Sequence, residues 1–292
     1  MLDARYHLFY SIAIFMMLGF GVAIGASFYG PVQMSQQREV VKRLDEQTRT
    51  VVQQRNQIQG RLSDDEAALI LLQPNLVRGK LAGKKVILIQ TGDYNDATQA
   101  ANQSLEDAGA TVAATVVLSG RWGTLTTRQR AALSSVAAMS DPVTQSKALL
   151  SALASALAQG TGAVPANGAV LTSLQQAGLL TLSGDLSQPC TLFVLVGGSS
   201  TDPPDTSVDT ALIAGFQSLA EPVTLTGCEP YSATASFMPA YQAAGVATID
   251  CIDLPLGQIS LPFALRGDAG DYGIKPTAKQ QLPDTLKGMA AP

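Results

Sequence analysis

Three cysteines are the side chains in this sequence best suited to redox or metal chemistry. Cys190, Cys228 and Cys251 stand far apart, and no two of them follow the C-x-x-C spacing. An odd number of thiols cannot pair fully within one chain. Isolated cysteines of this kind are ordinarily small buried side chains, and a disulfide or a metal site is the alternative interpretation.

A soft-metal site is the one centre that the residues around these thiols suggest. Cys228 directly precedes Glu229, and Cys251 lies two residues before Asp253. Met238 falls between the two pairs. Thiolate and thioether groups suit Cu(I), provided that the ends of strands bring these segments together. We therefore take Cys228 and Cys251 as candidate metal ligands, with copper as the corresponding ion, and expect no other cofactor.

Motifs for catalysis or nucleotide binding are missing from the sequence. The only histidine is His7, which excludes a Ser-His-Asp or Cys-His arrangement and a histidine zinc site farther along the chain. Neither G-x-G-x-x-G nor G-x-x-x-x-G-K-[ST] occurs. Residues 148–265 contain no Lys or Arg and eight acidic residues, so a cationic surface for nucleic acid is absent there. We expect a protein that is neither an enzyme nor a nucleic-acid binder.

An uncharged run at the N-terminus predicts a membrane anchor. Residues 8–29 contain no charged side chain in 22 positions, enough for a helix to cross a bilayer core of about 30 Å. A cleaved signal peptide is the alternative. The run is longer than the apolar region of about 7–15 residues in a signal peptide, and Arg5 is the only basic side chain before the run. Gly21 and Gly25 form a G-x-x-x-G pair, so we expect the transmembrane helices of two copies to pack together there in the membrane lipid, as part of a homodimer.

A heptad pattern follows the anchor and predicts a coiled-coil stalk. Residues 34, 41, 48, 55, 62 and 69 occupy a positions, and residues 37, 44, 51, 58, 65 and 72 occupy d positions. Arg61 at g and Glu66 at e suit a pair across a parallel homodimer. An amphipathic helix packed on its own globular domain is the alternative. We expect Gly30-Pro31 to break or kink the helix and Pro74 to end it.

Alternating strand and helix patterns fill the rest of the chain. We expect strands at residues 84–90, 111–118, 190–196, 222–226 and 245–250, and helices at 96–108, 126–139, 141–160, 207–220 and 233–244. Asp93 or Asn95 and then Asp141 are the expected N-caps. A loop is expected after Gly160, and a Pro- and Gly-rich tail over the domain surface after Asp253.

The predicted fold class is α/β, with an N-terminal transmembrane helix and a coiled-coil helix followed by a three-layer α/β sandwich with a mainly parallel sheet. We expect a transmembrane anchor at residues 1–30, a coiled-coil stalk at 31–73, an α/β Rossmann-like domain at 74–265 and a C-terminal extension at 266–292.

Two stretches of the sequence carry a family resemblance. They are the strand Lys84-Lys85-Val86-Ile87-Leu88-Ile89 and the late segment Asp250…Gly257-Gln258-Ile259…Phe263-Ala264-Leu265-Arg266-Gly267…Gly270-Asp271-Tyr272-Gly273. With the N-terminal helix and coil, they resemble the MctB family of mycobacterial-type copper-transport proteins, which has corynebacterial envelope relatives called SteB. The resemblance covers nearly the whole chain, and residues 257–273 are its most specific part.

The resemblance implies a role in copper efflux or homeostasis, and a single-pass cell-membrane protein whose globular domain lies outside the cytoplasm. It carries no catalytic or metal residue onto this chain. The alternative is a dimeric, non-catalytic scaffold of cell-envelope assembly that presents the α/β domain to a partner protein.

Overall fold

The computed structural model describes residues 4–139 and 141–289, with the side chains of residues 6–25, 41–139 and 141–286. The chain divides into two compact units, Met1–Asp65 and Glu66–Pro292. The first unit is purely helical where it is described, and all of the strands belong to the second.

A single helix, α1, runs from Ala4 to Val77. The expected break at Gly30-Pro31 is wrong, because the backbone stays helical across that pair. The expected end at Pro74 is also wrong. Proline cannot donate a helical hydrogen bond, but its carbonyl can accept one. Here the N–H of Arg78 donates to the Pro74 carbonyl at 3.0 Å, so one more turn follows.

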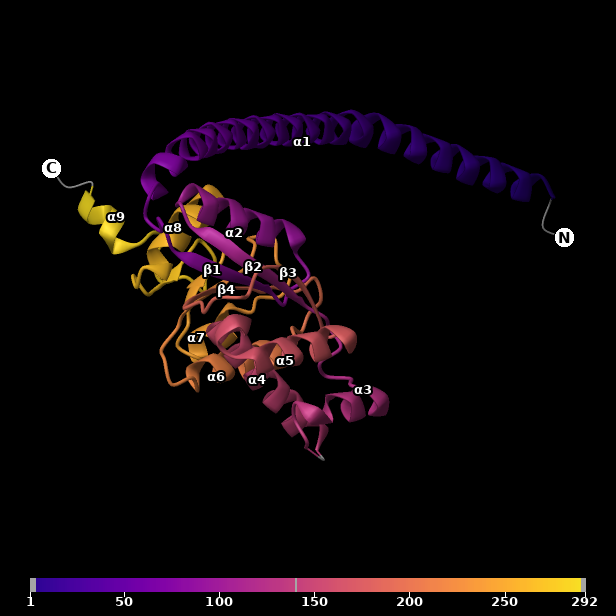
Figure 1. Ribbon diagram of the computed structural model, residues 1–292. Coiled ribbons are helices and arrows are strands. Elements are labelled where there is room, and N and C mark those ends of the chain that lie inside the picture. The colour runs from indigo at the N-terminus through magenta and orange to yellow at the C-terminus, as the bar shows by residue number, and fades with distance from the viewer. Residues whose placement is uncertain (1–3, 140, 290–292) are drawn as a thin grey trace. The chain divides into compact units, whose positions relative to one another are not determined.

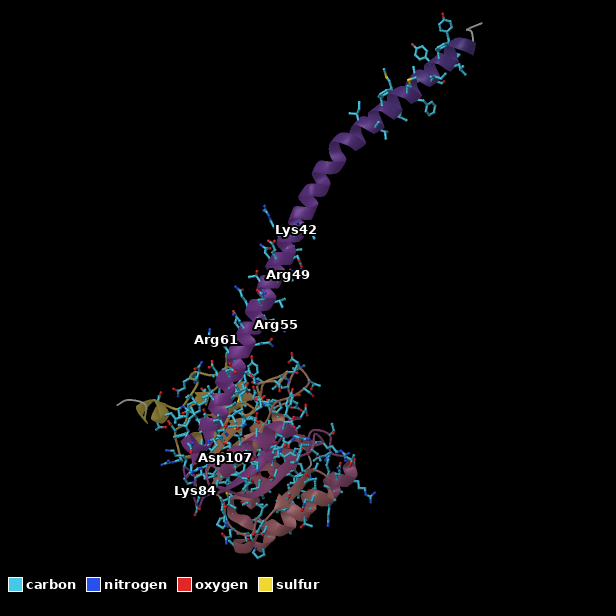
Figure 2. All side chains as sticks on the ribbon, turned by 90° about the horizontal axis from the view of Figure 1, so that it is seen from above. Lys42, Arg49, Arg55, Arg61, Lys84 and Asp107 are labelled. Atoms are coloured by element: carbon cyan, nitrogen blue, oxygen red, sulfur yellow. The ribbon has the colours of Figure 1, made fainter. Side chains whose placement is uncertain are left out.

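The apolar part of α1, from Tyr6 to Gly25, is long and apolar enough to cross a membrane, and its side chains are exposed. This N-terminal apolar helix fits a membrane-anchored protein. Farther along the same helix, polar side chains project on several sides, with Lys42, Arg49, Arg55 and Arg61 spaced along its length (Figure 2). Asp45 pairs with Arg49 one turn away at 2.9 Å, an exposed contact of small energetic value.

The second unit is built on a seven-stranded sheet in the order β3-β2-β1-β4-β5-β6-β7. All neighbouring strands are parallel except β2 and β3, which are antiparallel. The strands are β1 (Lys85–Gln90), β2 (Thr111–Leu118), β3 (Leu180–Gly184), β4 (Leu192–Val196), β5 (Thr224–Cys228), β6 (Ala247–Ile249) and β7 (Asp271–Tyr272).

Helices cover both faces of this sheet (Figure 1). On one face lie α2 (Asn95–Asp107) and α8 (Pro255–Leu265). On the other lie α4 (Pro142–Ala163), α5 (Pro165–Gln176), α6 (Ser207–Gln217) and α7 (Met238–Ala243). The short helices α3 (Thr127–Ala132), η1 (Leu133–Ser135) and α9 (Asp284–Met289) complete the set. The predicted α/β class with a mainly parallel sheet is confirmed.

The central strands are apolar because both of their faces are covered. Ile87 and Ile89 lie in the core beneath α4 and α6, while Val86 and Leu88 lie in the opposite core beneath α2 and α8. All four are fully buried. A parallel strand covered on two sides reads as a continuous apolar run, and residues 86–89 have that pattern.

Helix starts agree with the sequence at some positions and not at others. Asp141 caps α4 as expected, since its carboxylate accepts the N–H of Thr144 at 2.8 Å. The expected cap of α2 by Asp93 or Asn95 is wrong. Tyr94 occupies that position and makes no side-chain cap, because Asp93 and Asn95 bond elsewhere.

Two regions are more regular than the sequence suggests. Residues 165–176, expected as part of a loop, form α5, which follows a non-helical Gly160 and begins at Pro165. After Asp253 the expected surface tail is instead the buried helix α8 and the edge strand β7. Prolines occupy the first turn of α5 and of α8, where a missing N–H costs nothing.

The glycines of the late segment allow close backbone packing. A Cβ on Gly257 would overlap the Cys251 carbonyl, and one on Gly273 would overlap the Asp250 carboxylate. Gly273 also has a φ of 142°, which side-chain-bearing residues rarely adopt. The segment therefore needs glycine at these positions to lie against the end of β6.

Replacing Gly273 with alanine should destabilise the protein by at least about 2 kcal/mol, because strain and overlap with a carboxylate add together. Urea unfolding followed by circular dichroism measures this change. Gly120→Ala is the matched control, since a Cβ there meets no atom within 4 Å. Equal stability of the two variants would contradict the close packing at Gly273.

Candidate functional site

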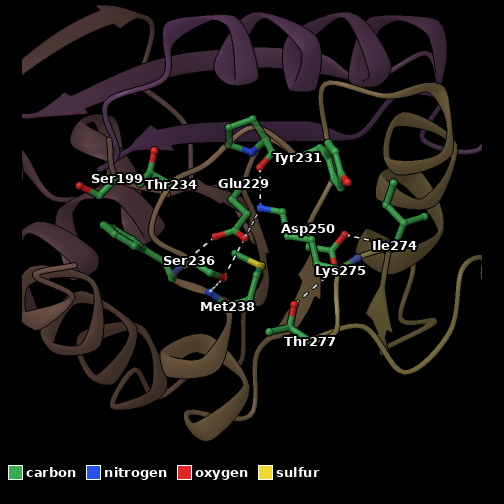
Figure 3. Close-up of polar contacts among 12 residues, drawn as sticks. Ser199, Glu229, Tyr231, Thr234, Ser236, Met238, Asp250, Ile274, Lys275 and Thr277 are labelled. Carbon is green, nitrogen blue, oxygen red and sulfur yellow. Dashed lines mark hydrogen bonds and ion pairs between the residues drawn. The ribbon is translucent and has the colours of Figure 1, made fainter. Parts of the chain in front are cut away.

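The carboxyl ends of β5 and β6 carry a buried polar cluster around Glu229 (Figure 3). Glu229 directly follows β5, and its side chain is fully buried. One oxygen, Oε1, accepts the Ser236 hydroxyl at 2.7 Å and the Lys275 ammonium at 2.7 Å. The other, Oε2, accepts the backbone N–H of Phe237 at 2.8 Å. Both carboxylate oxygens are therefore engaged inside the protein.

Lys275 neutralises this buried carboxylate. Its side chain is 13% exposed, and its ammonium also donates to the Pro230 carbonyl at 2.8 Å. A buried carboxylate is tolerated only when paired and hydrogen-bonded, and both conditions hold here. The two charges cancel, and protein donors already occupy both carboxylate oxygens. This cluster is therefore better suited to fixing the C-terminal segment on the sheet than to binding a charged ligand.

Asp250 holds the same C-terminal segment from the next strand. Its carboxylate accepts the backbone N–H groups of Ile274 at 2.9 Å and Lys275 at 3.0 Å. The hydroxyl of Thr277 donates to it at 3.4 Å. Glu229 and Asp250, at the ends of adjacent strands, thus bind one short stretch of chain through its side chain and its backbone (Figure 3).

A second buried carboxylate lies between β1, α6 and α7. Asp209 in the first turn of α6 is 1% exposed, and it accepts the hydroxyls of Thr91 and Tyr241. Burial raises the pKa of Asp209 to about 6, against the opposing effect of these two hydrogen bonds. Burial likewise raises the pKa of Tyr241, which remains the donor.

The crevice between β1 and β4, where open parallel sheets commonly bind ligands, is closed. The N–H of Asp93 donates to the Gly198 carbonyl at 3.1 Å, and the Asp93 carboxylate accepts from the N–H and hydroxyl of Ser200, each at 2.9 Å. The bond from the Ser200 backbone is the main reason that the pKa of Asp93 is lowered. A Cβ on Gly92 would overlap residues 197 and 198. The two loops therefore fill the space that a nucleotide would take.

The candidate metal ligands lie deep in the domain. Cys228 and Cys251 are fully buried free thiols, and Cys228 belongs to the core beneath α2 and α8, together with Val194 and Ile249. Burial raises the pKa of Cys228, to which Cys251 also contributes, and it raises the pKa of Cys251 to about 12. The raised pKa values keep both thiols protonated at neutral pH.

The other predicted neighbours do not join them. Met238 packs in the opposite core with α6 and α7, and Glu229 is bonded to Lys275. The carboxylate of Asp253 accepts the backbone N–H of Tyr231 at 2.6 Å. Among the residues whose placement is described, no three His, Cys, Asp or Glu side chains gather as a metal-binding group.

Cys190 lies apart from the other two thiols. It sits in the core beneath α4, and its thiol donates to the carbonyls of Lys85 at 3.2 Å and Leu192 at 3.4 Å. Burial raises the pKa of Cys190. The ordinary interpretation, a small buried thiol, describes it fully.

The helix-packing glycines lie on the exposed apolar part of α1, where neither has a heavy atom within 4 Å of its Cβ position. Counting the heptad back through the unbroken helix places Gly21 at b and Gly25 at f. Ala23 falls at d and Gly19 at g, beside a hollow of about 650 Å³ that also includes Ser11 and Phe15. The predicted glycine pair and the stalk's apolar seam therefore lie on different sides of the helix.

Neither buried carboxylate cluster was predicted from the sequence. One signal was available, because Lys275 is the first lysine after Lys147, and a buried acid needs a cation as its partner. Nothing in the sequence indicates that Asp209 meets Thr91 and Tyr241, which are 118 and 32 residues away.

Removing the Lys275 charge should cost about 3–5 kcal/mol, because Glu229 would be left buried and unpaired. Lys275→Met tests this by denaturant unfolding at pH 7. Arg49→Met is the control, since Arg49 pairs with Asp45 at 2.9 Å and their side chains are 76% and 58% exposed. The control should lose less than about 1 kcal/mol. A loss at Lys275 as small as that of the control would overturn the assignment.

Asp209 should make the domain less stable as pH rises. Its folded pKa of about 6 exceeds the ordinary 3.8, so the folded state holds the proton more tightly. The resulting stabilisation is complete below pH 3.8 and is lost as pH rises to 6, by about 3 kcal/mol at 1.4 kcal/mol per pKa unit. The difference in unfolding free energy between wild type and Asp209→Asn, followed from pH 3.5 to 7, measures it. A difference that does not change with pH would contradict the raised pKa.

Comparison with known proteins places this architecture in a family. Residues 1–283 match the family described as "Copper transport outer membrane protein, MctB". Proteins named copper transporter MctB from Mycobacterium bovis and Mycobacterium tuberculosis are 26% identical over 311 aligned residues, covering 94% of this chain and 96% of theirs. The family is named for transport and not for an enzymatic activity. Because the match extends over nearly the whole chain, this protein belongs to the MctB family.

Proposed function

We propose that the protein acts in copper efflux or homeostasis, anchored in the cell membrane by residues 6–25 with the α/β domain outside the cytoplasm. The observation that carries this proposal is the end-to-end match to a copper-transport family, including the N-terminal helix. The closed crevice between β1 and β4 agrees with a non-catalytic role, because the position where such a fold would hold a nucleotide is filled.

Cys228 and Cys251 are the residues we propose to contact copper. The order of β5 and β6 brings the two thiols to neighbouring strand ends, and thiolate sulfur is a preferred ligand of Cu(I). Their raised pKa values mean that binding must displace protons from both thiols. Copper affinity at this pair should therefore rise with pH.

Cu(I) titration of the full-length protein in detergent, with a competing chelator of known affinity, tests this assignment. We expect one ion per chain, bound at least about tenfold more weakly in Cys228→Ser and Cys251→Ser. Cys190→Ser is the matched control, since that thiol lies in the other core and should leave affinity unchanged. Equal copper binding by all variants would contradict the assignment of Cys228 and Cys251. Copper tolerance that does not change when the gene is deleted would contradict the proposed function.

A second candidate is a dimeric scaffold that presents the α/β domain to an envelope partner. It is favoured by the exposed apolar side chains at a and d positions of α1, namely Val41, Leu44, Val51, Ile58 and Leu62. Such a stripe is stable in water only when another helix covers it. If the heptad seam of the stalk continues into the membrane, Ala23 would lie between the paired helices. Gly21 and Gly25 would then face a different helix.

The mass of the full-length protein in detergent, measured by light scattering, tests the pairing. Two chains per particle are expected. A single chain at micromolar concentration would exclude the scaffold in this form without touching the copper proposal.

A further inference from the structure

The last three turns of α1 leave an apolar patch exposed on the second unit. Leu69, Ile70, Leu71, Leu72 and Leu76 are between 37% and 77% exposed, although they belong to the same compact unit as the sheet. Five large aliphatic side chains within eight residues form a patch that a monomer rarely leaves open.

One side of this helix end is already packed on its own domain. Val77 is fully buried in the core beneath α2 and α8, and the Gln73 amide donates to the Gln258 side chain of α8 at 2.8 Å. Gln73 is itself 4% exposed. The orientation of these turns on the domain is therefore fixed, and so is the direction in which the exposed leucines point.

The exposed leucines continue the heptad of the stalk. Leu69 and Leu76 occupy a positions and Leu72 the d position between them, with exposed fractions of 37%, 38% and 54%. Pro74 falls at f, outside the seam, which explains how the helix can pass through a proline without interrupting the stripe. The seam thus extends one turn beyond the point at which the sequence pattern was expected to stop.

We propose that Leu69, Leu72 and Leu76 of this patch are the contact where the second units of two copies of this chain meet, as the domain end of a parallel coiled coil. This contact rests on the proposed pairing of chains, and it extends that pairing from the stalk to the last turns of α1. Leu69, Leu72 and Leu76 of each copy interdigitate across a two-fold axis, directly beside Gln73 and Val77.

Two features of the chain favour a second copy as the occupant. The a and d positions nearer the membrane include Thr48, Arg55 and Asp65, so the unbroken apolar stretch lies at the domain end. Arg61 and Glu66, at g and the following e, lie just before that stretch and have opposite charges that can pair across a parallel dimer. A lipid or an unrelated apolar partner would not require this heptad spacing.

The consequence is a fixed arrangement of the two α/β domains. Because Gln73 and Val77 attach the helix end to each domain, joining the helix ends orients one domain against the other. Surfaces on the two domains would then face a partner protein together, with a spacing set by the seam rather than by a flexible linker.

Cysteine crosslinking of the full-length protein in detergent tests the contact. Leu72→Cys, at d, should form an intersubunit disulfide in more than half of the chains under mild oxidation, because d residues of a parallel pair meet across the axis. Leu71→Cys is the matched control. It is 77% exposed at position c, on another side of the helix, and should stay largely unlinked. The native cysteines at 190, 228 and 251 are buried and can remain.

The outcomes separate this inference from the pairing on which it rests. A two-chain particle in which Leu72→Cys links no more than Leu71→Cys would overturn the contact at the helix end while leaving the stalk paired. A one-chain particle would overturn both. In a second test, Leu69→Asp with Leu72→Asp should shift the two-chain particle to one chain, and normal α/β circular dichroism would show that the domain remains folded.

Discussion

The buried ion pair between Glu229 and Lys275 is the contact on which the carboxyl edge of the sheet depends. It joins residues 46 positions apart, at 2.7 Å, with the carboxylate fully buried and the lysine side chain only 13% exposed. Without the lysine, the carboxylate at the end of β5 would be buried and unpaired, and without the carboxylate, the C-terminal segment would be held at this edge by Asp250 alone. The late glycines, the bonds to Asp250 and the edge strand β7 are arranged around this pair.

Local signals made much of the fold predictable. The apolar run at residues 86–89, the Asp141-Pro142 start of α4 and the positive φ of Gly109 after α2 all follow from short-range rules. Elements that depend on distant contacts were not predictable. The edge strand β7 has only two residues, and α5 contains Gly168 and few large apolar side chains.

The candidate sites divide in the same way. The position of Cys228 and Cys251 at neighbouring strand ends follows from the order of the sheet, which the alternating pattern indicates. The burial of the thiols could not be predicted. Cys228 lies in a core that α8 covers, and the Pro- and Gly-rich sequence of this segment does not indicate a helix. Asp209 is likewise hidden, since its partners come from β1 and α7.

The distribution of polar groups indicates where function can reside. At the carboxyl edge, the carboxylates of Glu229 and Asp250 are occupied by protein donors, and the neighbouring loops of β1 and β4 bond to each other. Apolar surface remains exposed on the N-terminal helix and on the leucines of its last turns. Apolar surface left in water is removed by association, so the proposed membrane anchoring and the proposed pairing of chains would both cover surface that the single chain leaves open.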